Sequence, residues 1–282
     1  MKIGIIGNGF VGQATNLFKN SSVKSVIYDI EPKKCLPLGL ELKHMHDCDF
    51  IFVCVPTPME SSGKCHLSIV ESVIEDLKKV IDTTKTFIVL RSTVPPGTSE
   101  RLDCYFMPEF LTEKNWKNDF KQLEHWIFGL KNNDNDVVFM YKMKMLINLA
   151  YDYECINYKN IHFVTTKEAE MIKYFRNTFL ATKVSFCNEF EEFCRRKNIS
   201  YKNVKNIATL DSRITISHTN VPGHDGKRGF GGTCFPKDSQ SLLHQMKEIN
   251  MNSYIIKSSI ERNENIDRPE TDWKTDKGRA VI

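Results

Sequence analysis

The chain opens with Ile3-Gly4-Ile5-Ile6-Gly7-Asn8-Gly9-Phe10-Val11-Gly12, an apolar run that leads into three glycines with G-x-G-x-x-G spacing. In a strand–turn–helix unit the first glycine makes the tight turn, the second lets the backbone approach a pyrophosphate, and the third lets helix and strand pack closely. The helix N-terminus then faces the negative phosphates. We therefore predict a dinucleotide site whose loop contacts come from Gly7, Gly9, Phe10, Val11 and Gly12.

Asp29 indicates which dinucleotide is bound. It ends the next apolar run, 20 residues after Gly9, where an acidic side chain accepts a hydrogen bond from the ribose 2′-hydroxyl. A carboxylate there also repels a 2′-phosphate, although Lys33 and Lys34 follow closely. The sequence therefore favours NAD over NADP.

The first 165 residues alternate short apolar runs with helical patterns, which is typical of a Rossmann-like parallel α/β sheet. The expected strands are Lys2–Ile6, Lys24–Asp29, Phe50–Val55, Thr86–Arg91, Tyr105–Met107, His125–Leu130 and Asn160–Val164. The expected helices between them lie near Val11–Lys19, Leu67–Ile81 and Asp134–Ala150. We assign residues 1–165 to an NAD-binding domain.

The pattern changes to helical after this point. From Lys167 to Lys197 there is no proline or glycine, and an aromatic stripe recurs at helical spacing: Ile172, Phe175, Phe179, Phe186, Phe190 and Phe193. We interpret the stripe as core or as a dimer interface. A shorter helix over Tyr201–Leu210, a glycine-rich loop and two further helices complete an all-helical domain over residues 166–267, with residues 268–282 as a tail.

Bulk composition excludes several classes of protein. The net charge of +4 is small, and no basic run is interleaved with aromatic residues, so nucleic acid is a poor candidate partner. There is neither a signal-peptide pattern nor an apolar stretch long enough for a membrane span, so we expect a cytoplasmic protein without a membrane partner. The nine cysteines form no C-x-x-C pair, and the spacing of His44, His46 and Cys48 fits no familiar metal site.

The second informative stretch is Gly229-Phe230-Gly231-Gly232-Thr233-Cys234-Phe235-Pro236-Lys237-Asp238. We expect a helix to begin at Lys237, with Pro236 at its first turn and Cys234 just ahead of it. A thiol beside a helix N-terminus and a lysine has the electropositive setting that favours the thiolate. Such a thiolate next to a nicotinamide can add to an aldehyde, and the thiohemiacetal can then be oxidised to a thioester.

With these motifs in place, the chain resembles the UDP-glucose/GDP-mannose dehydrogenase family, which oxidises a sugar 6-hydroxyl to a carboxylate with two NAD⁺. The resemblance runs in family order from residue 3 to about residue 265. The further matching segments are Val55–Pro58, Arg91–Gly97, Met107–Glu113, Glu168–Asn177, Leu210–Ile214 and the Cys234 loop. The resemblance implies a nucleotide-sugar substrate, such as UDP-glucose, and a role in polysaccharide biosynthesis.

The resemblance also implies roles for individual residues. Cys234 would be the nucleophile of the second oxidation, and Lys173 and Asn177 would hold the oxyanion at carbon 6. Asp238 and Thr93 would hold a water that accepts the first proton, and Glu109 would assist thioester hydrolysis. The remaining implied contacts are cofactor contacts by Pro56, Thr57, Thr93 and Glu113, and substrate contacts by Glu109, Lys173, Asn177, Arg213, Gly231 and Lys237. Arg213 would reach the substrate of a neighbouring subunit, which implies a homodimer through the long helix.

Three departures from the family pattern keep alternatives open. The family continues into a second Rossmann-like domain that binds the nucleotide, whereas here only Thr275–Ile282 resembles the start of that domain's first strand. His125-Trp126 stands where an arginine is common, and the basic pair Lys227-Arg228 lies in an extended loop with phosphate contacts or solvation as its possible roles. The competing interpretations are a β-hydroxyacid dehydrogenase, which performs one oxidation without a nucleophilic cysteine, and an inactive NAD-binding remnant.

Overall fold

The computed structural model describes all 282 residues, which divide into two compact units. The first unit comprises residues 1–57 and 67–173, and the second comprises residues 58–66 and 174–282. The second unit therefore includes a short excursion, residues 58–66, from the N-terminal half of the chain.

The first unit is built on one seven-stranded sheet with the order β2-β1-β3-β4-β5-β6-β7. Its strands are β1 (Lys2–Ile6), β2 (Lys24–Tyr28), β3 (Phe50–Val53), β4 (Phe87–Leu90), β5 (Tyr105–Phe106), β6 (His125–Leu130) and β7 (Asn160–Thr165). The Rossmann-like α/β class is confirmed. The expected parallel arrangement holds for every strand pair except β5 and β6, which run antiparallel. At the edge of the same sheet, β6 and β7 are parallel to each other and are joined by a long helix. A helical crossover makes these two strands parallel to each other, but it does not set their direction relative to β5.

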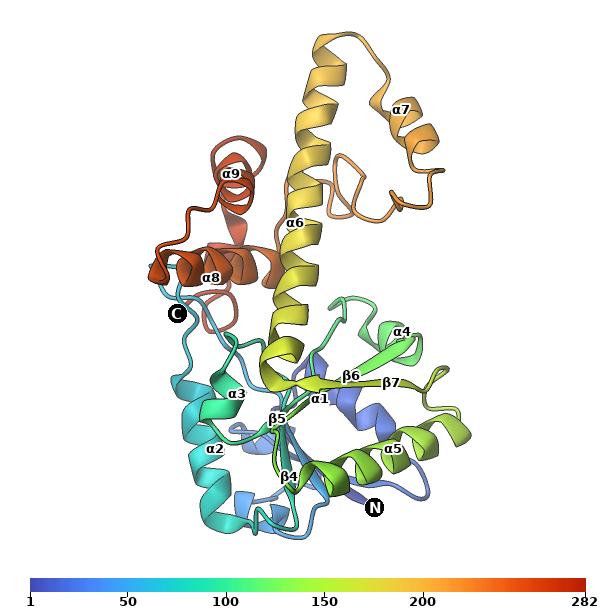
Figure 1. Cartoon of the computed structure of the whole chain (residues 1–282), viewed down its shortest axis with the longest axis vertical. Helices are drawn as coiled ribbons and strands as arrows, with labels where there is room; N and C mark the ends of the chain where they lie inside the picture. Colours follow the sequence, from blue (N-terminus) through green and yellow to red (C-terminus); the bar gives the residue numbers. More distant parts are fainter. The chain divides into compact units, whose positions relative to one another are not determined.

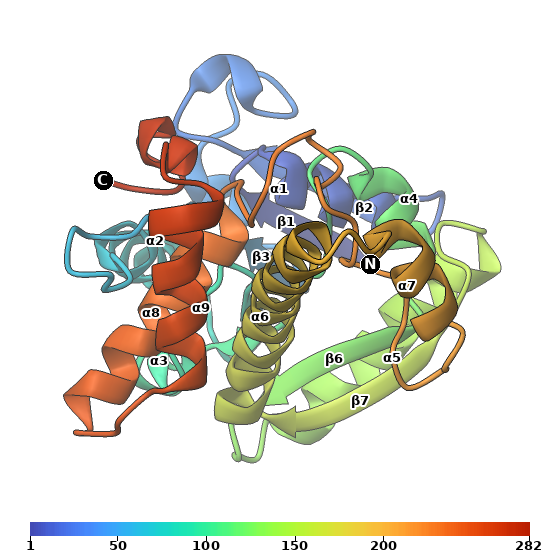
Figure 2. The same ribbon diagram turned by 90° about the horizontal axis from the view of Figure 1, so that it is seen from above.

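Apolar side chains cover both faces of this sheet, as expected for parallel strands. Along β1 and β3, Ile5 and Phe52 enter one buried cluster while Ile6 and Ile51 enter the other, because successive residues of a strand point to opposite faces. The helices of this unit are α1 (Phe10–Thr15), α2 (Ser68–Val80), α3 (Thr98–Arg101), α4 (Trp116–Lys121) and α5 (Asp136–Asp152). Figure 2 shows β6 and β7 side by side, with α5 alongside them.

The second unit is helical. α6 (Thr166–Arg196) begins in the first unit and continues in the second from Tyr174, and it is the long helix of Figure 1. It is followed by α7 (Tyr201–Ala208), α8 (Cys234–Glu248) and α9 (Ile255–Arg262), and a π-helical turn over Asn263–Asp267 extends α9. No helix of the chain combines the length and the apolar character that crossing a bilayer requires.

The aromatic stripe of α6 does not lie in the core of this chain. Its phenylalanines are between 40% and 68% exposed: Phe175, Phe179, Phe186, Phe190 and Phe193. The core of the second unit is instead a small cluster of Ala181, Phe230, Leu243 and Ile260. The interpretation of the stripe as core is therefore wrong, and its interpretation as a dimer interface stays a prediction.

The C-terminal segment does not form the expected strand. Asp272–Thr275 is a 3-10 turn, and Val281 makes isolated bridges with Met59 and Lys277. The Met59 amide donates to the Ala280 carbonyl at 2.8 Å, and the Ile282 amide donates to the Met59 carbonyl at 3.1 Å. The chain turns back at Gly278 instead of extending, because the Gly278 amide bonds to the Val281 carbonyl.

Candidate active site

The predicted phosphate loop has the geometry that a dinucleotide needs. Gly7 has a φ of +92°, and a Cβ there would lie 2.7 Å from the Cys54 carbonyl oxygen, while a Cβ on Gly12 would lie 1.9 Å from the Gly7 oxygen. Gly9 differs, because it precedes the first turn of α1 and a Cβ there would meet nothing within 4 Å. Gly7 and Gly12 are therefore required by packing, and Gly9 leaves open space at the helix N-terminus where a phosphate fits.

Asp29 ties the end of β2 to this loop. Its Oδ2 accepts from the Asn8 amide at 2.7 Å, and its Oδ1 accepts from the Glu31 amide at 2.9 Å. A carboxylate has about four lone-pair sites, so both oxygens keep the capacity to accept from a ribose hydroxyl. The buried Asn8 Oδ1 has no hydrogen-bond partner within the chain. These residues fit NAD, and Phe10 and Val11 form the first turn of the helix that follows.

The loops after β3 and β4 are pinned to each other at the carboxyl ends of the strands, the edge where dinucleotides bind in such sheets. The buried Thr57 hydroxyl donates to the Thr93 carbonyl at 2.8 Å, and the Ser92 hydroxyl donates to the Val55 carbonyl at 2.6 Å. The structure thus brings Thr57 and Thr93 together. Pro56 is exposed beside them, and Glu113 is exposed in the segment before α4.

Glu109 and Lys173 form a buried ion pair in the first unit. Lys173 Nζ donates to Glu109 Oε1 and to the Glu109 carbonyl oxygen, both at 2.7 Å, and both side chains are at most 6% exposed. Burial alone would raise the pKa of Glu109. The Lys173 ammonium, the Leu111 amide and the Arg91 guanidinium outweigh burial and lower that pKa. Glu109 is therefore ionised, and it fixes the position of the lysine predicted to hold the oxyanion.

Two buried residues of the first unit, Arg91 and Glu170, support these loops. Both lie in segments that match the family, but the sequence alone predicts no role for either. Arg91, 1% exposed, donates to the Thr15 hydroxyl and lies over the Phe120 ring. Glu170, on α6, accepts from the Gly97 amide at 2.6 Å and the Ser99 amide at 2.8 Å, so it caps the start of α3. A charged residue directly after an apolar strand was the only sequence signal for Arg91.

In the second unit, the cysteine loop leads into a chain of buried polar contacts. Asp238 is fully buried, and it accepts from Asn177 Nδ2 at 2.6 Å and from Lys237 Nζ at 2.6 Å. Burial alone would lower the pKa of Lys237, but Asp238 outweighs it, with Cys65 and Cys234 adding to the effect, and the pKa is raised. Lys237 is therefore an ammonium within electrostatic reach of the Cys234 sulfur.

Cys234 itself begins α8, so the expected helix start at Lys237 is three residues too late. Pro236 does lie in the first turn, and the half-buried thiol stands where the first amides of the helix are unsatisfied. Cys234 and Asp238 are four residues apart and share one face of α8. The predicted residues Asn177, Lys237, Asp238 and Cys234 are thus brought together within this unit.

The other residues predicted to contact substrate or phosphate, Arg213, Gly231, Lys227 and Arg228, contact other parts of the protein in the structure. The Arg213 side chain is 86% exposed and pairs with Asp211. A Cβ on Gly231 would lie 2.3 Å from Arg268 Cζ, so packing against this guanidinium already explains the glycine. Lys227 pairs with Asp272, and Arg228 pairs with Glu191, so both have partners within the protein. No group of three or more His, Cys, Asp or Glu side chains is arranged to hold a metal ion.

Trp126, in the His125-Trp126 pair that departs from the family pattern, belongs to the core of the first unit. It is fully buried, its Nε1 donates to the Tyr158 carbonyl at 2.8 Å, and its ring packs on Phe18 and Phe120. Core packing therefore explains the tryptophan.

Comparison with known proteins places these motifs in one family. Two sequence models of the UDP-glucose/GDP-mannose dehydrogenase family match, that of the NAD binding domain at residues 35–145 and that of the central domain at residues 167–265. The UDP-glucose 6-dehydrogenase of Rickettsia typhi is 27% identical, and the alignment covers 93% of this chain and 67% of the relative. The putative UDP-glucose 6-dehydrogenase YtcA of Bacillus subtilis is 31% identical, with 76% of this chain and 50% of the relative covered.

Solved structures share the fold. A UDP-glucose dehydrogenase from Pyrobaculum islandicum superposes with a TM-score of 0.78 at 22% identity, covering 93% of this chain and 68% of that one. The 3-hydroxyisobutyrate dehydrogenase of Mycobacterium tuberculosis has a TM-score of 0.68 at 12% identity, covering 92% and 91%. The chain thus spans half to two thirds of the relatives named above, YtcA and the Rickettsia enzyme. The two matched domains show that the chain belongs to the UDP-glucose/GDP-mannose dehydrogenase family, whose N-terminal domain binds NAD.

Proposed function

We propose that this protein oxidises the 6-hydroxyl of a nucleotide sugar to a carboxylate, with Cys234 as the nucleophile of the second oxidation. One observation carries the proposal. Cys234 begins α8, and Asp238, one turn later on the same face, is buried between Lys237 and Asn177. A helix N-terminus and a nearby ammonium, here that of Lys237, are the setting in which a reactive thiolate is stabilised, and Asp238 and Asn177 hold that ammonium and the helix start in place.

Each residue then has a defined task. NAD⁺ held by the first unit would supply the hydride acceptor for both oxidations, which gives an expected yield of two NADH per sugar. In the first oxidation, Lys173 and Asn177 donate to oxygen 6, and a water held by Asp238 and Thr93 takes the hydroxyl proton. The Cys234 sulfur then adds to the aldehyde carbon, and oxidation of the thiohemiacetal gives a thioester. Water, assisted by Glu109, breaks the carbon–sulfur bond, releasing the carboxylate and regenerating the thiol.

Cofactor contacts in this proposal are those of the first unit. Gly7, Gly9 and Gly12 hold the pyrophosphate and Asp29 the ribose. The nicotinamide side is assigned to Pro56, Thr57, Thr93 and Glu113. Substrate contacts by Gly231, Lys237 and Arg213 follow from the family pattern, with Arg213 serving the neighbouring subunit.

A homodimer through α6 is the second part of the proposal. The five exposed phenylalanines of α6 form stacked or tilted pairs along one side of the helix, an apolar surface unusual for a protein without a partner. A second copy of the chain offers the matching surface, as isologous contacts require. Phe186→Glu should convert the dimer to monomers in sedimentation equilibrium. The matched control Val137→Glu, at a 69% exposed site on α5, should leave the dimer intact.

NADH stoichiometry tests the reaction. With UDP-glucose, GDP-mannose, free sugars and small hydroxyacids as candidates, the wild type should form two NADH per molecule of one nucleotide sugar. Cys234→Ser should stop at the aldehyde, with at most one. Two NADH from that variant would remove Cys234 from the mechanism. One NADH from a small hydroxyacid alone would favour the β-hydroxyacid dehydrogenase alternative, and NAD binding without turnover would favour an inactive remnant.

A further inference from the structure

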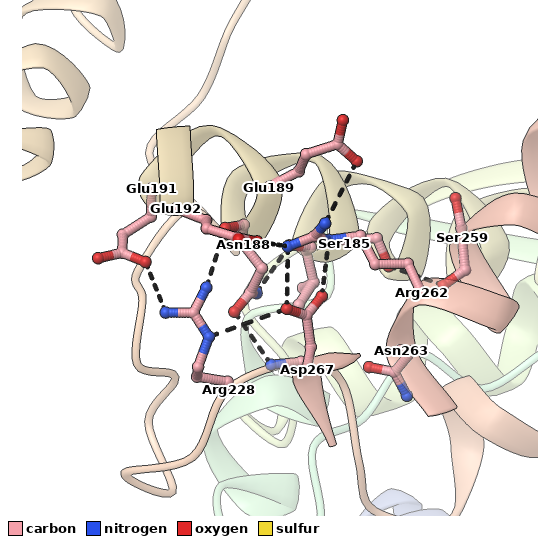
Figure 3. Close-up of polar contacts among 12 residues, drawn as sticks. Ser185, Asn188, Glu189, Glu191, Glu192, Arg228, Ser259, Arg262, Asn263 and Asp267 are labelled. Atoms are coloured by element: carbon pink, nitrogen blue, oxygen red, sulfur yellow. Dashed lines mark hydrogen bonds and ion pairs between the residues drawn. The ribbon is translucent and has the colours of Figure 1, made fainter. Parts of the chain in front are cut away.

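Figure 3 shows how Arg228, in the loop that precedes Cys234, is held within the second unit by side chains of α6 and by Asp267. Arg228 Nη1 donates to Glu191 Oε2 at 2.5 Å, and Arg228 Nη2 donates to the Asn188 carbonyl at 3.0 Å. The Gly229 amide donates to Asn188 Oδ1 at 3.2 Å. Since Asn188 and Glu191 both belong to α6, the first part of the loop is fastened to that helix.

Asn263 holds the next residue from the other side. Its Oδ1 accepts from the Phe230 amide at 2.7 Å, and its Nδ2 donates to the Phe230 carbonyl at 2.9 Å. The side chain thus pairs with the Phe230 backbone as a neighbouring strand would. Asn263 is fully buried, and a Cβ on Gly229 would lie 2.3 Å from its Oδ1, so the close approach requires glycine at that position.

The turn that carries Asn263 is itself anchored. Asn263–Asp267 is a π-helical turn, a rare conformation that is frequent at functional sites. The Asp267 side chain lies between Arg262, at 3.0 Å, and Arg228, at 3.8 Å. Arg262 also pairs with Glu192 of α6 at 3.0 Å. The donor and acceptor of Asn263 are therefore presented from a rigid base.

Beyond Phe230 the loop continues through two glycines to Thr233, whose hydroxyl lies 3.7 Å from the Cys234 sulfur. Gly231 packs on Arg268, whereas Gly232 is exposed, has a φ of +70°, and a Cβ there would meet nothing within 4 Å. Only Gly231, Gly232 and Thr233 separate Phe230 from Cys234. The anchor at Phe230 is thus the last fixed backbone position before the thiol.

We propose that Asn263 is a positioning residue that latches the Phe230 backbone and so holds Cys234 in the first turn of α8, beside Lys237. This inference rests on the proposed function, since it gives Cys234 a task. Asn263 does not touch the thiol. It acts through four residues of backbone, and without it the glycines let the start of α8 fray, so the thiolate loses the helix-terminal amides and the nearby ammonium.

Site-resolved alkylation tests the latch without any turnover. The full chain is treated with iodoacetamide at several values between about pH 5 and 10, and labelling of Cys234 is followed by peptide mass spectrometry, which separates it from the other cysteines. In the wild type the midpoint of the labelling profile should lie below the ordinary thiol value of about 8.5. In Asn263→Ala it should move up by about 0.2 to 0.7 pH units, the range that a helix N-terminus gives a facing charge.

Matched variants separate positioning from stability. Asn265→Ala lies in the same π-helical turn at an exposed position and should leave the midpoint unchanged. Ser185→Ala removes a partly buried hydrogen bond from α6 to the Ser259 carbonyl on α9, so it should lower the melting temperature without moving the midpoint. If Asn263→Ala does not fold, Asn263→Asp keeps an acceptor for the Phe230 amide but sets a carboxylate oxygen against the Phe230 carbonyl, so the latch is broken on one side and an upward shift is expected there as well.

The outcomes are distinct from those of the NADH experiment. An unchanged midpoint in the folded Asn263 variants, with a low wild-type midpoint, overturns the latch and leaves the proposed function standing. An equal shift in Ser185→Ala also overturns it, because the effect would then follow stability. A wild-type midpoint at the ordinary thiol value overturns the latch and removes the thiolate argument as well.

Discussion

Removing the ammonium of the buried Glu109–Lys173 pair should destabilise the first unit strongly. Lys173→Met keeps the length of the side chain and leaves Glu109, 5% exposed, without the cation that contacts both its carboxylate and its carbonyl. Breaking one side of a buried pair costs about 3–5 kcal/mol, because the remaining charge is buried without compensation. Arg91 and the Leu111 amide still lower the pKa of Glu109, so we expect the lower end of that range.

The pH dependence of this loss gives a sharper test. In the wild type the pKa of Glu109 is lowered, so its contribution to stability is present above the ordinary glutamate value of about 4.3 and is lost as the pH falls further. In Lys173→Met the strongest lowering influence is gone, so we expect burial to outweigh Arg91 and the Leu111 amide and to raise the pKa of Glu109. Stability should then be regained as the pH falls towards about 4.3. The difference between the two proteins should therefore shrink by roughly 1 kcal/mol or more between about pH 7.5 and 5.

Urea unfolding followed by tryptophan fluorescence measures this difference. In a Trp273→Phe background the remaining tryptophans, Trp116 and Trp126, both lie in the first unit and report on it alone. Lys167→Met is the matched control on the same helix, because Lys167 pairs with Glu100 in solvent and such pairs contribute about 0–1 kcal/mol. A loss below 1 kcal/mol in Lys173→Met, or a loss that does not change with pH, would refute the reasoning.

Three further predictions follow from the first unit. Gly9→Ala should leave the melting temperature nearly unchanged, because a Cβ at this position meets no other atom within 4 Å. The same methyl group should weaken NAD binding, measured by calorimetry, because it blocks the approach of the pyrophosphate to the backbone. An unchanged affinity for NAD would contradict the assignment of this loop. Asp29→Asn should reduce the preference for NAD over NADP, measured as a ratio of dissociation constants, because the charge that repels a 2′-phosphate is gone. Glu170→Gln should lower the free energy of unfolding by about 1–3 kcal/mol, since one of the two amides at Gly97 and Ser99 loses its acceptor, and a loss below 0.5 kcal/mol would argue against the cap.

The elements that could be predicted from sequence are those whose pattern is local and long. β1 was predicted with its observed bounds, and α6 was predicted within one residue at each end, because its sequence lacks proline and glycine over many turns. The short helices α3 and α4 were missed. α4 is only six residues long and is fastened by a tertiary contact, since Asp119 Oδ2 accepts from the Thr112 amide at 2.7 Å. The antiparallel β5–β6 pair rests on a two-residue strand with no pattern of its own.

In the candidate site, too, the local motifs could be predicted from the sequence and the long-range contacts could not. The glycine spacing and the position of Asp29 were visible because the phosphate loop is one contiguous motif. The partners that hold the reactive residues were not, because they come from far along the chain: Glu109 is 64 residues from Lys173, and Asn177 is 61 residues from Asp238. A resemblance to a family supplies the names of such residues but not their contacts.

The contacts change how the matching motifs should be interpreted. A polar residue inside a motif can face a ligand, or it can hold the backbone that presents another residue, and the sequence looks the same in both cases. Glu170, within the matching segment Glu168–Asn177, belongs to the second kind, and so does Asn263, which lies outside the matching segments. Each is fully buried and bonds to the backbone of a loop. Substituting such a residue should alter reactivity only through the loop it holds, which is why their effects must be measured on the position of the loop and on thiol chemistry as well as on turnover. A loss of activity alone would assign both residues to the wrong class.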